Sequence, residues 1–305
     1  MSRHRRPRVA RWRHAALQRG AGPFEGTVHR FDCAVEHFGN FVGVVSEHLA
    51  QDEHGALTSG RQLQRGHEGD KAVLVTGANR GIGQALVHEA LNRGARRVYA
   101  AARRPGTHPD ARATPLTLDV TDAAQIQRAV DQVKALDILV NNAGVADYDD
   151  LSDRSVLERH LAVNLVGTFD VTQAFLPLLM RSRGAVVNNL SVNAVAPLPV
   201  IPAYSISKAA AFNLTQSLRV LLAGRGVRVH AVLTGPVDTD MTRGFDIPKA
   251  APKSLARAIF DGVQRAEDEI FPDPMSESVA HSWRIGAAKM LERQYAALLD
   301  PQPVQ

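Results

Sequence analysis

Short apolar runs alternate with longer amphipathic stretches along the chain from position 71 onward. The runs are rich in Val, Leu and Ala and end in Gly, Asn or Asp, a pattern typical of buried strands. The stretches between them repeat apolar residues at helical spacing, as at 86, 87, 90 and 91. The runs predict seven strands, at about 72–77, 96–102, 115–122, 137–144, 184–190, 227–233 and 269–271.

The amphipathic stretches predict helices between these strands. The first ends near Gly94, the second begins at Thr121 or Asp122 as its N-cap, and the others lie at about 152–181, 203–223 and 254–266. Alternating strands and helices predict an α/β fold, a doubly wound parallel sheet with helices on both faces. We expect it to form a single domain at 70–305.

Residues 1–69 differ in composition from the rest of the chain. Positions 1–30 hold eight arginines against a single acid, and seven of the twelve histidines lie between positions 4 and 67. We interpret 1–69 as an Arg/His-rich leader that is disordered or weakly ordered, or as the product of a misassigned start. No signal-peptide apolar region follows the arginines, so we expect a cytoplasmic protein.

Charge and composition argue against nucleic acids, membranes and metal ions as binding partners. The net charge of +5 is concentrated in positions 1–30, and the basic residues lack interleaved aromatics, so we expect no nucleic-acid binding. No apolar run approaches the ~20 residues that span a bilayer, so we expect no membrane partner. Cys33 is the one cysteine, which excludes a thiolate metal cluster, and the histidines lack ligand spacing. We therefore expect no metal.

A glycine-rich turn follows the first predicted strand and precedes the first predicted helix. It holds Gly77, Gly81 and Gly83 in the spacing G-x-x-x-G-x-G. Glycines let a backbone approach a pyrophosphate, and the N-terminus of the helix offers free N–H groups to it. A tight turn alone also needs glycine. The flanking strand and helix favour a dinucleotide site.

The end of the second strand indicates which dinucleotide would bind. In dinucleotide folds an acid here takes the ribose 2′-hydroxyl, whereas an arginine accommodates a 2′-phosphate. No acid occurs between Arg96 and Gly106, and Arg103 follows the strand. Arg80 in the glycine turn adds a second cation. We therefore expect NADP(H) to be preferred over NAD(H).

The stretch from Ser191 to Lys208 carries candidate proton-transfer chemistry. Tyr204 lies thirteen residues after Ser191, and Lys208 four after Tyr204, so that on a helix the last two share a face. A nearby ammonium would lower the pKa of the Tyr204 phenol towards neutrality, making it a general acid or base. Ser191 could hold the same substrate oxygen. Asn164, an amide among apolar residues, is either a structural satisfier or part of the site.

Taken together, these motifs resemble the short-chain dehydrogenase/reductase family over roughly 71–271. The resemblance is carried by TGANRGIG at 76–83, Asp119, NNAG at 141–144, Asn164, Ser191, the Tyr204/Lys208 pair and GPVDT at 235–239. It implies a Rossmann-type fold and a reaction in which a nicotinamide cofactor exchanges hydride with a carbonyl or alcohol. It also implies a homodimer or homotetramer.

The resemblance implies a role for each matching residue. Tyr204 would be the general acid or base, Lys208 would lower its pKa and hold the nicotinamide ribose, Ser191 would orient the substrate oxygen, and Asn164 would hold a water. The implied cofactor contacts are Gly77, Arg80, Gly81, Ile82, Gly83, Arg103, Asp119, Val120, Asn141, Ala143, Gly144, Tyr204, Lys208, Pro236, Val237 and Thr239.

The chain departs from the family pattern at several positions. The serine strand reads NNLS instead of N-I-S-S, Ala194 stands where Gly is common, and His230 and Thr234 replace the common Asn and Pro. None of these removes a candidate catalytic group. The leading hypothesis is an NADPH-dependent ketone or aldehyde reductase. A 3-oxoacyl-thioester reductase is a narrower alternative, and a dinucleotide-binding regulator without turnover is the rival.

Overall fold

A parallel seven-stranded sheet forms the centre of the protein. The computed structural model describes residues 70–244 and 246–296, so the predicted leader at 1–69 lies outside the described residues. The sheet order is β3-β2-β1-β4-β5-β6-β7, with every neighbouring pair parallel. The strands are β1 Ala72–Thr76, β2 Arg97–Ala102, β3 Ala113–Thr117, β4 Ile138–Asn141, β5 Ala185–Asn189, β6 Arg228–Val232 and β7 Glu269–Ile270.

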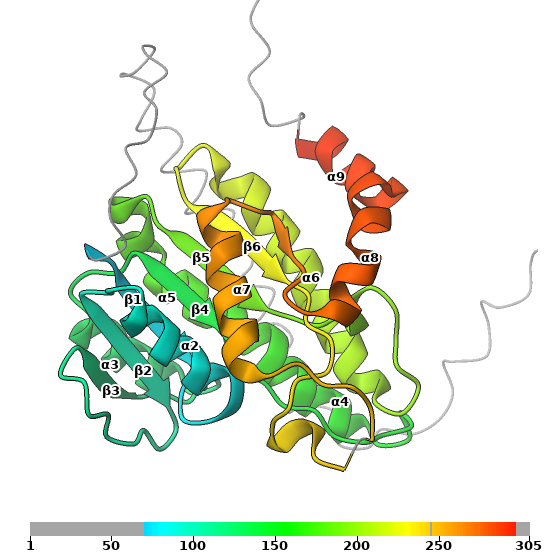
Figure 1. Ribbon diagram of the computed structural model, residues 1–305, viewed down its shortest axis with the longest axis horizontal. Coiled ribbons are helices and arrows are strands. Elements are labelled where there is room, and N and C mark those ends of the chain that lie inside the picture. The colour runs from blue at the N-terminus through cyan, green and yellow to red at the C-terminus, as the bar shows by residue number, and fades with distance from the viewer. Residues whose placement is uncertain (1–69, 245, 297–305) are drawn as a thin grey trace, which may run out of the picture. The chain divides into compact units, whose positions relative to one another are not determined.

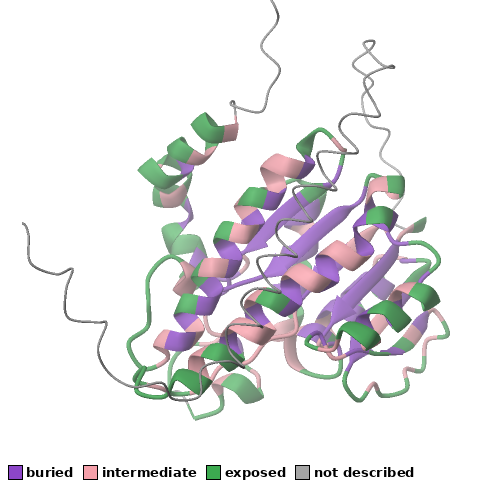
Figure 2. Ribbon diagram, turned by 180° about the vertical axis from the view of Figure 1, so that it is seen from behind, coloured by how far each residue is buried: buried purple, intermediate pink, exposed green. Residues whose placement is uncertain are grey.

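Helices cover both faces of this sheet, which confirms the doubly wound arrangement (Figure 1). On one face, α2 (Gly81–Asn92) packs against α7 (Pro252–Gln264). On the other lie α3 (Ala123–Gln132), α5 (Gly167–Ser182) and α6 (Pro202–Ala223), with α4 (Arg154–Leu161) packed on α6. The strands are buried and the outer faces of the helices are exposed, as the reverse view shows (Figure 2).

The main core lies between the sheet and the α2–α7 pair. Leu86 of α2 and Leu255 of α7 are fully buried there, against Val75 and Val140 of the two central strands. Burying side chains of this size contributes about 1.5–3 kcal/mol each. This packing fixes the start of α2 over the end of β1, where the glycine turn lies.

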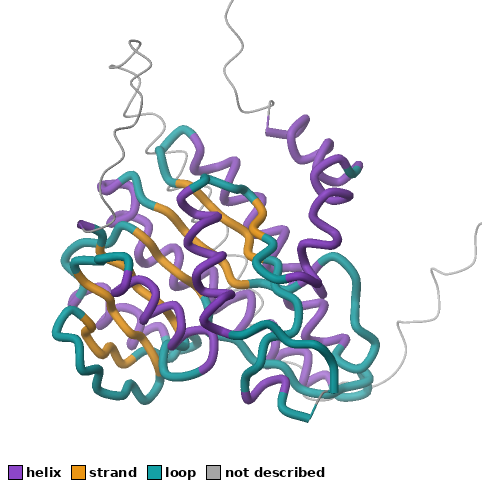
Figure 3. Tube along the Cα trace, viewed as in Figure 1, coloured by secondary structure: helices purple, strands orange, loops and turns teal. Residues whose placement is uncertain are grey.

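Parallel strands end at the same edge of the sheet, and the connections that follow them meet there. Figure 3 shows the longest loops gathered at this end. Asp122 accepts a hydrogen bond from the Gln125 N–H and is the cap of α3 rather than Thr121. Gly94 has φ +88 directly after α2, as a helix-terminating glycine does.

The helical stretch between β4 and β5 is interrupted by a π-helical turn at Ala162–Val166, which holds Asn164. Such turns bulge one backbone group out of the regular ladder and often mark functional sites. The stretch Arg154–Ser182 is long and apolar enough, by length and composition, to cross a membrane, and half of that window is buried inside the domain. Core helices of globular domains have the same property.

Two further helices, α8 (Pro274–Ile285) and α9 (Ala287–Ala296), follow β7. The sequence pattern did not predict them, because they present short apolar faces interrupted by charge. Phe212 of α6 and Trp283 of α8 pack with ring centroids 5.1 Å apart. The far end, α9, is held mainly by charged side chains.

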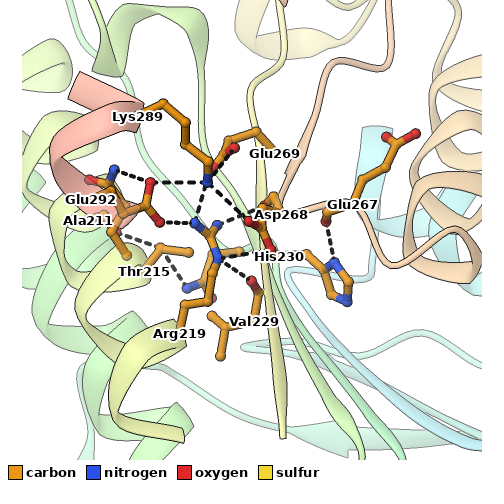
Figure 4. A network of polar contacts seen from close by, with 12 residues as sticks. Ala211, Thr215, Arg219, Val229, His230, Glu267, Asp268, Glu269, Lys289 and Glu292 are labelled. Carbon is orange, nitrogen blue, oxygen red and sulfur yellow. Dashed lines mark hydrogen bonds and ion pairs between the residues drawn. The ribbon is translucent and has the colours of Figure 1, made fainter. Parts of the chain in front are cut away.

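A cluster of five charged side chains fastens α9 to the sheet edge (Figure 4). Lys289, only 3% exposed, lies 3.0 Å from carboxylate oxygens of both Asp268 and Glu269 and 3.1 Å from Glu292. Arg219 of α6 pairs with Glu269 at 2.8 Å and also with Glu292. Each buried charge therefore has several partners of opposite sign.

Replacing Lys289 by Met should lower the free energy of unfolding by about 3 kcal/mol, because removing one member of a buried ion cluster strands the others. Urea denaturation measures this. Arg265→Met is the control, since its pair with Glu267 is largely exposed and should be worth less than about 1 kcal/mol. Equal losses in the two variants would contradict the clamping role of Lys289.

Candidate functional site

The glycine turn has the backbone shape that a phosphate cradle needs. Gly77 and Gly81 have φ +65 and +53, in the left-handed region that favours glycine. A Cβ on Gly83 would lie 2.1 Å from the carbonyl oxygen of Gly77. The helix that follows has no side-chain cap, so the N–H groups of its first turn are open to an anion. These features fit a dinucleotide pyrophosphate.

Thr76 and Asn142 tie this turn to the end of β4. The N–H groups of Asn142 and Ala143 donate to Thr76 Oγ1 at 2.9 and 3.0 Å. In return, Asn142 Nδ2 donates to the carbonyl oxygens of Thr76 and Gly77 at 2.9 and 3.3 Å. The turn is therefore held in one position relative to the neighbouring strand.

Asn142, not its neighbour Asn141, is the asparagine that builds this corner. The Asn141 side chain points into the opposite helix layer, where Nδ2 donates to Thr172 Oγ1 and Asn188 Oδ1, both at 2.9 Å. Only the backbone of Asn141 remains available at the sheet edge. Successive residues of a strand face opposite sides of the sheet. This alternation was the signal in the sequence that could have shown that only one of the two asparagine side chains faces the glycine turn.

Of the two predicted 2′-phosphate cations, Arg80 lies in the glycine turn and Arg103 directly follows β2. Arg103 and Arg104 are exposed after β2, and no hydrogen bond or ion pair joins them to another residue in the part of the chain that the structure describes. Arg80 instead pairs with Asp240 at 3.2 Å, on the segment after β6. A Cβ on Gly81 would lie 3.1 Å from Thr239 Cγ2, so that segment also lies against the turn.

The remaining predicted cofactor residues line the same edge. Asp119 Oδ1 accepts from the Thr121 N–H and hydroxyl at 3.0 and 2.8 Å, and Val120 is buried. Val237 is buried and Pro236 half-buried in the connection that leads to Thr239. Ile82 packs at the margin of the main core. The structure thus gathers these residues where the strands end.

Tyr204 and Lys208 lie one turn apart on α6 and face the end of β5. The Lys208 ammonium is 5.6 Å from the centroid of the Tyr204 ring. Its Nζ donates a 2.8 Å hydrogen bond to the carbonyl oxygen of Asn189. The Ser191 hydroxyl, two residues further along, lies close enough to the Tyr204 hydroxyl to lower the pKa of that phenol. The three predicted catalytic residues therefore come together.

Asn164 joins this group through the π-helical turn. Its Oδ1 accepts from the Val145 N–H at 2.9 Å, and its Nδ2 donates to the Val145 carbonyl oxygen at 3.0 Å and to Ser207 Oγ at 2.9 Å. A Cβ on Gly144 would lie 3.2 Å from Asn164 Oδ1 and 3.8 Å from Lys208 Nζ. The Asn164 side chain thus satisfies the hydrogen bonds of the loop after β4 and is also a neighbour of Lys208.

His160 is a site residue that the sequence reasoning missed. It is fully buried, and its ring meets the Tyr204 ring edge-on with centroids 6.5 Å apart. Its Nδ1 lies 2.7 Å from the Val156 carbonyl oxygen, and its Nε2 accepts from the Asp147 N–H at 3.1 Å. Its helical spacing of four before Asn164 was the available signal.

A family model described as short chain dehydrogenase matches residues 71–249, more than half of the chain. The chain belongs to the short-chain dehydrogenase family. It is therefore an oxidoreductase of alcohols and carbonyls that uses a dinucleotide cofactor.

Similar proteins agree with this assignment. Oxidoreductase UcpA of Salmonella typhimurium is 35% identical over 211 residues, which cover 62% of this chain and 80% of that protein. Estradiol 17-beta-dehydrogenase 2 of Mus musculus is 37% identical over 194 residues, covering 58% and 51%. A short chain dehydrogenase from Burkholderia cenocepacia, solved in complex with NADP, has a TM-score of 0.66 at 35% identity and covers 73% of this chain and 96% of that one.

The pKa values of this short-chain dehydrogenase differ from the sequence expectation. Burial raises the pKa of Tyr204 to about 12, although the hydrogen bond with Ser191 opposes this shift. Burial also lowers the pKa of Lys208 to about 8. The expected lowering of the phenol pKa is therefore not found, because desolvation disfavours the phenolate more than its neighbours stabilise it.

Exposed apolar side chains are concentrated on the loops that follow the strands, at the sheet edge where Tyr204 lies, and on α8. They are exposed and come from the loops after β4, β5 and β6 and from α8, namely Tyr148, Leu151, Val195, Leu198, Val200, Met241, Ile247, Met275 and Val279. Within 70–244 and 246–296, no group of three or more His, Cys, Asp or Glu side chains could hold a metal ion.

Replacing Lys208 by Met should stabilise the cofactor-free protein at pH 7. Burial lowers the pKa of Lys208 from 10.5 to about 8 in the folded protein. Between these two pH values, the unfolded chain binds more protons at this site than the folded chain does. The destabilisation caused by burying the Lys208 ammonium is therefore full below pH 8 and fades as the pH rises. Urea denaturation at pH 7 and pH 10 should show the advantage of the variant shrinking. Exposed Lys253→Met is the control, and a pH-independent difference would contradict the burial effect.

Proposed function

We propose that this short-chain dehydrogenase reduces ketones or aldehydes with NADPH, and oxidises the corresponding alcohols in reverse. The carrying observation is the convergence of Ser191, Tyr204 and Lys208 beside Asn164 at the sheet edge where the glycine turn lies. All four positions hold competent side chains. This intact set argues against the rival, a dinucleotide-binding regulator without turnover.

The chain's own residues supply binding and proton transfer. Bound NADPH would supply the hydride. The Tyr204 phenol, protonated at neutral pH, would donate its proton to the carbonyl oxygen as negative charge develops there, and Ser191 would hold the same oxygen. Lys208, which is positively charged below pH about 8, would favour the phenolate that Tyr204 leaves behind and hold the ribose.

The preference for NADPH is supported by the charges around the glycine turn. Arg103 is exposed at the end of β2 with no acid between 97 and 106, and Arg80 lies in the turn itself. The Burkholderia relative was solved with NADP. For the 2′-phosphate to engage Arg80, this arginine would exchange Asp240 for the phosphate, an exchange of one exposed ion pair for another.

The substrate we propose is an uncharged, largely apolar carbonyl compound. The apolar side chains of the three loops and α8 would desolvate such a molecule. Estradiol 17-beta-dehydrogenase 2, one of the similar proteins, is named for an apolar alcohol of this kind.

Arg103→Ala should selectively weaken NADPH binding. Loss of charge-assisted hydrogen bonds worth about 1.5–3 kcal/mol predicts roughly a ten- to hundredfold rise in the NADPH dissociation constant. NADH binding should not change. Fluorescence titration of both cofactors measures this, with the exposed Arg128→Ala of α3 as the control. Equal wild-type affinities for the two cofactors would overturn the NADPH preference.

Tyr204→Phe should abolish most turnover while leaving the protein folded and able to bind NADPH. Loss of a positioned general acid predicts a roughly 10²- to 10⁴-fold fall in kcat. The assay follows NADPH absorbance with a panel of ketones and aldehydes graded by apolar surface. Turnover that survives in Tyr204→Phe, or wild-type binding of NADPH without turnover of any panel member, would favour the regulator.

A further inference from the structure

Asp273 is a buried carboxylate that lies outside every motif the sequence analysis identified. It follows β7, is 6% exposed and is the N-cap of α8. Its Oδ1 accepts from the Ser276 N–H at 3.0 Å, and its Oδ2 accepts from the Ser276 hydroxyl at 2.9 Å. These bonds explain how Asp273 begins a helix. They do not explain its third partner.

That third partner is the backbone N–H of Gly235, which donates to Asp273 Oδ2 at 2.8 Å. Gly235 lies in the connection after β6, thirty-eight residues away along the chain. Within 70–244 and 246–296, no cation pairs with Asp273. The charge is therefore compensated by these N–H and O–H donors and by the N-terminus of α8.

The peptide group that donates to Asp273 also reaches Ser191 through its carbonyl. The carbonyl oxygen of Thr234 belongs to the same peptide as the Gly235 N–H. It accepts from the Ser191 hydroxyl at 3.3 Å and from the Val192 N–H at 3.0 Å. One rigid peptide plane thus lies between the carboxylate and the hydroxyl.

The fit between Asp273 and Gly235 leaves no room for a side chain. A Cβ on Gly235 would lie 2.5 Å from Asp273 Oδ1 and 3.1 Å from Met275 Cβ. Gly235 does not have a positive φ, unlike Gly77 and Gly81. The glycine is therefore required by the approach of α8, and not by the conformation of the turn.

We propose that Asp273 is a positioning residue for Ser191, acting through the Thr234–Gly235 peptide. This inference rests on the proposed function, because it assumes that Ser191 holds the substrate oxygen. The carboxylate fixes the N–H end of the peptide, so the carbonyl end is fixed as well. An N–H held by a carboxylate also makes its carbonyl a stronger acceptor.

The Ser191 hydroxyl needs such an anchor because it can rotate. In this structure its proton is directed at Thr234, and its oxygen accepts from the Asn193 N–H, 3.1 Å away. When a substrate carbonyl binds, the proton would turn to the carbonyl oxygen while the Ser191 oxygen keeps its place. A hydroxyl held in one rotamer keeps its oxygen at a fixed distance from the phenol. Loss of the anchor would let Ser191 sample rotamers that do not meet the substrate oxygen.

Two variants separate this role from the capping of α8. Asp273→Ser keeps a good N-cap residue, but its side chain is too short to reach Gly235. Ser276→Ala weakens the same cap and leaves the Gly235 contact intact. Similar melting temperatures for the two would show that the cap is equally affected.

Amide hydrogen exchange of the full chain gives a readout that needs no substrate. In Asp273→Ser, exchange should quicken at Gly235 and also at Val192 and Asn193, whose N–H groups bond Thr234 and Ser191. In Ser276→Ala, faster exchange should be confined to 274–285. No change at 192–193 in Asp273→Ser would overturn the proposal, whatever the enzyme catalyses.

A double-mutant cycle tests whether Asp273 acts through Ser191. It compares kcat values for the carbonyl compound of the panel that the wild type reduces fastest. Asp273→Ser should lower kcat about tenfold in the wild type and leave it unchanged in a Ser191→Ala background, because both changes remove the same interaction. Ser276→Ala should keep kcat within twofold. Equal losses in both backgrounds would refute the action through Ser191. A Ser191→Ala variant that is fully active would instead refute the proposed function.

Discussion

The joint between the ends of β1 and β4 is the constraint on which the rest of the site depends. The strand order reverses there, and a doubly wound sheet opens a crevice at such a point. Thr76 and Asn142 bridge it with hydrogen bonds in both directions. Asn189 extends the bridge, since its Nδ2 donates to Asn142 Oδ1 at 2.9 Å while its carbonyl oxygen holds Lys208. The glycine turn and the catalytic lysine are therefore held in one frame.

Much of this frame could be predicted from the sequence because it follows from local periodicity. The apolar runs predicted all seven strands, although the third ends at Thr117, five residues before its predicted end. Parallel strands necessarily bring the residues after them to one edge. What could not be predicted depends on contacts between distant segments. Asp273 gives no local sign that it reaches Gly235, and α9 depends on Lys289 meeting acids twenty residues away.

The pKa values of the site residues were harder to predict from the sequence than their positions. Tyr204 and Lys208 lie together as their spacing suggested. Burial, however, raises the pKa of Tyr204 and lowers the pKa of Lys208, so both shifts favour the neutral form of the side chain. Desolvation depends on how much of the chain covers a group, and the spacing of two residues does not give this. The site thus has the right groups in the right place, and a charged, ribose-bearing cofactor would change the surroundings that set these values.

The two edge strands limit how the sheet can extend. In the described sheet, one edge is β3, whose middle residue Pro115 has no N–H to offer, and the other is β7, which has only two residues. A foreign strand would find few unpaired backbone groups at either side. The described sheet is therefore poorly suited to strand-by-strand stacking of copies.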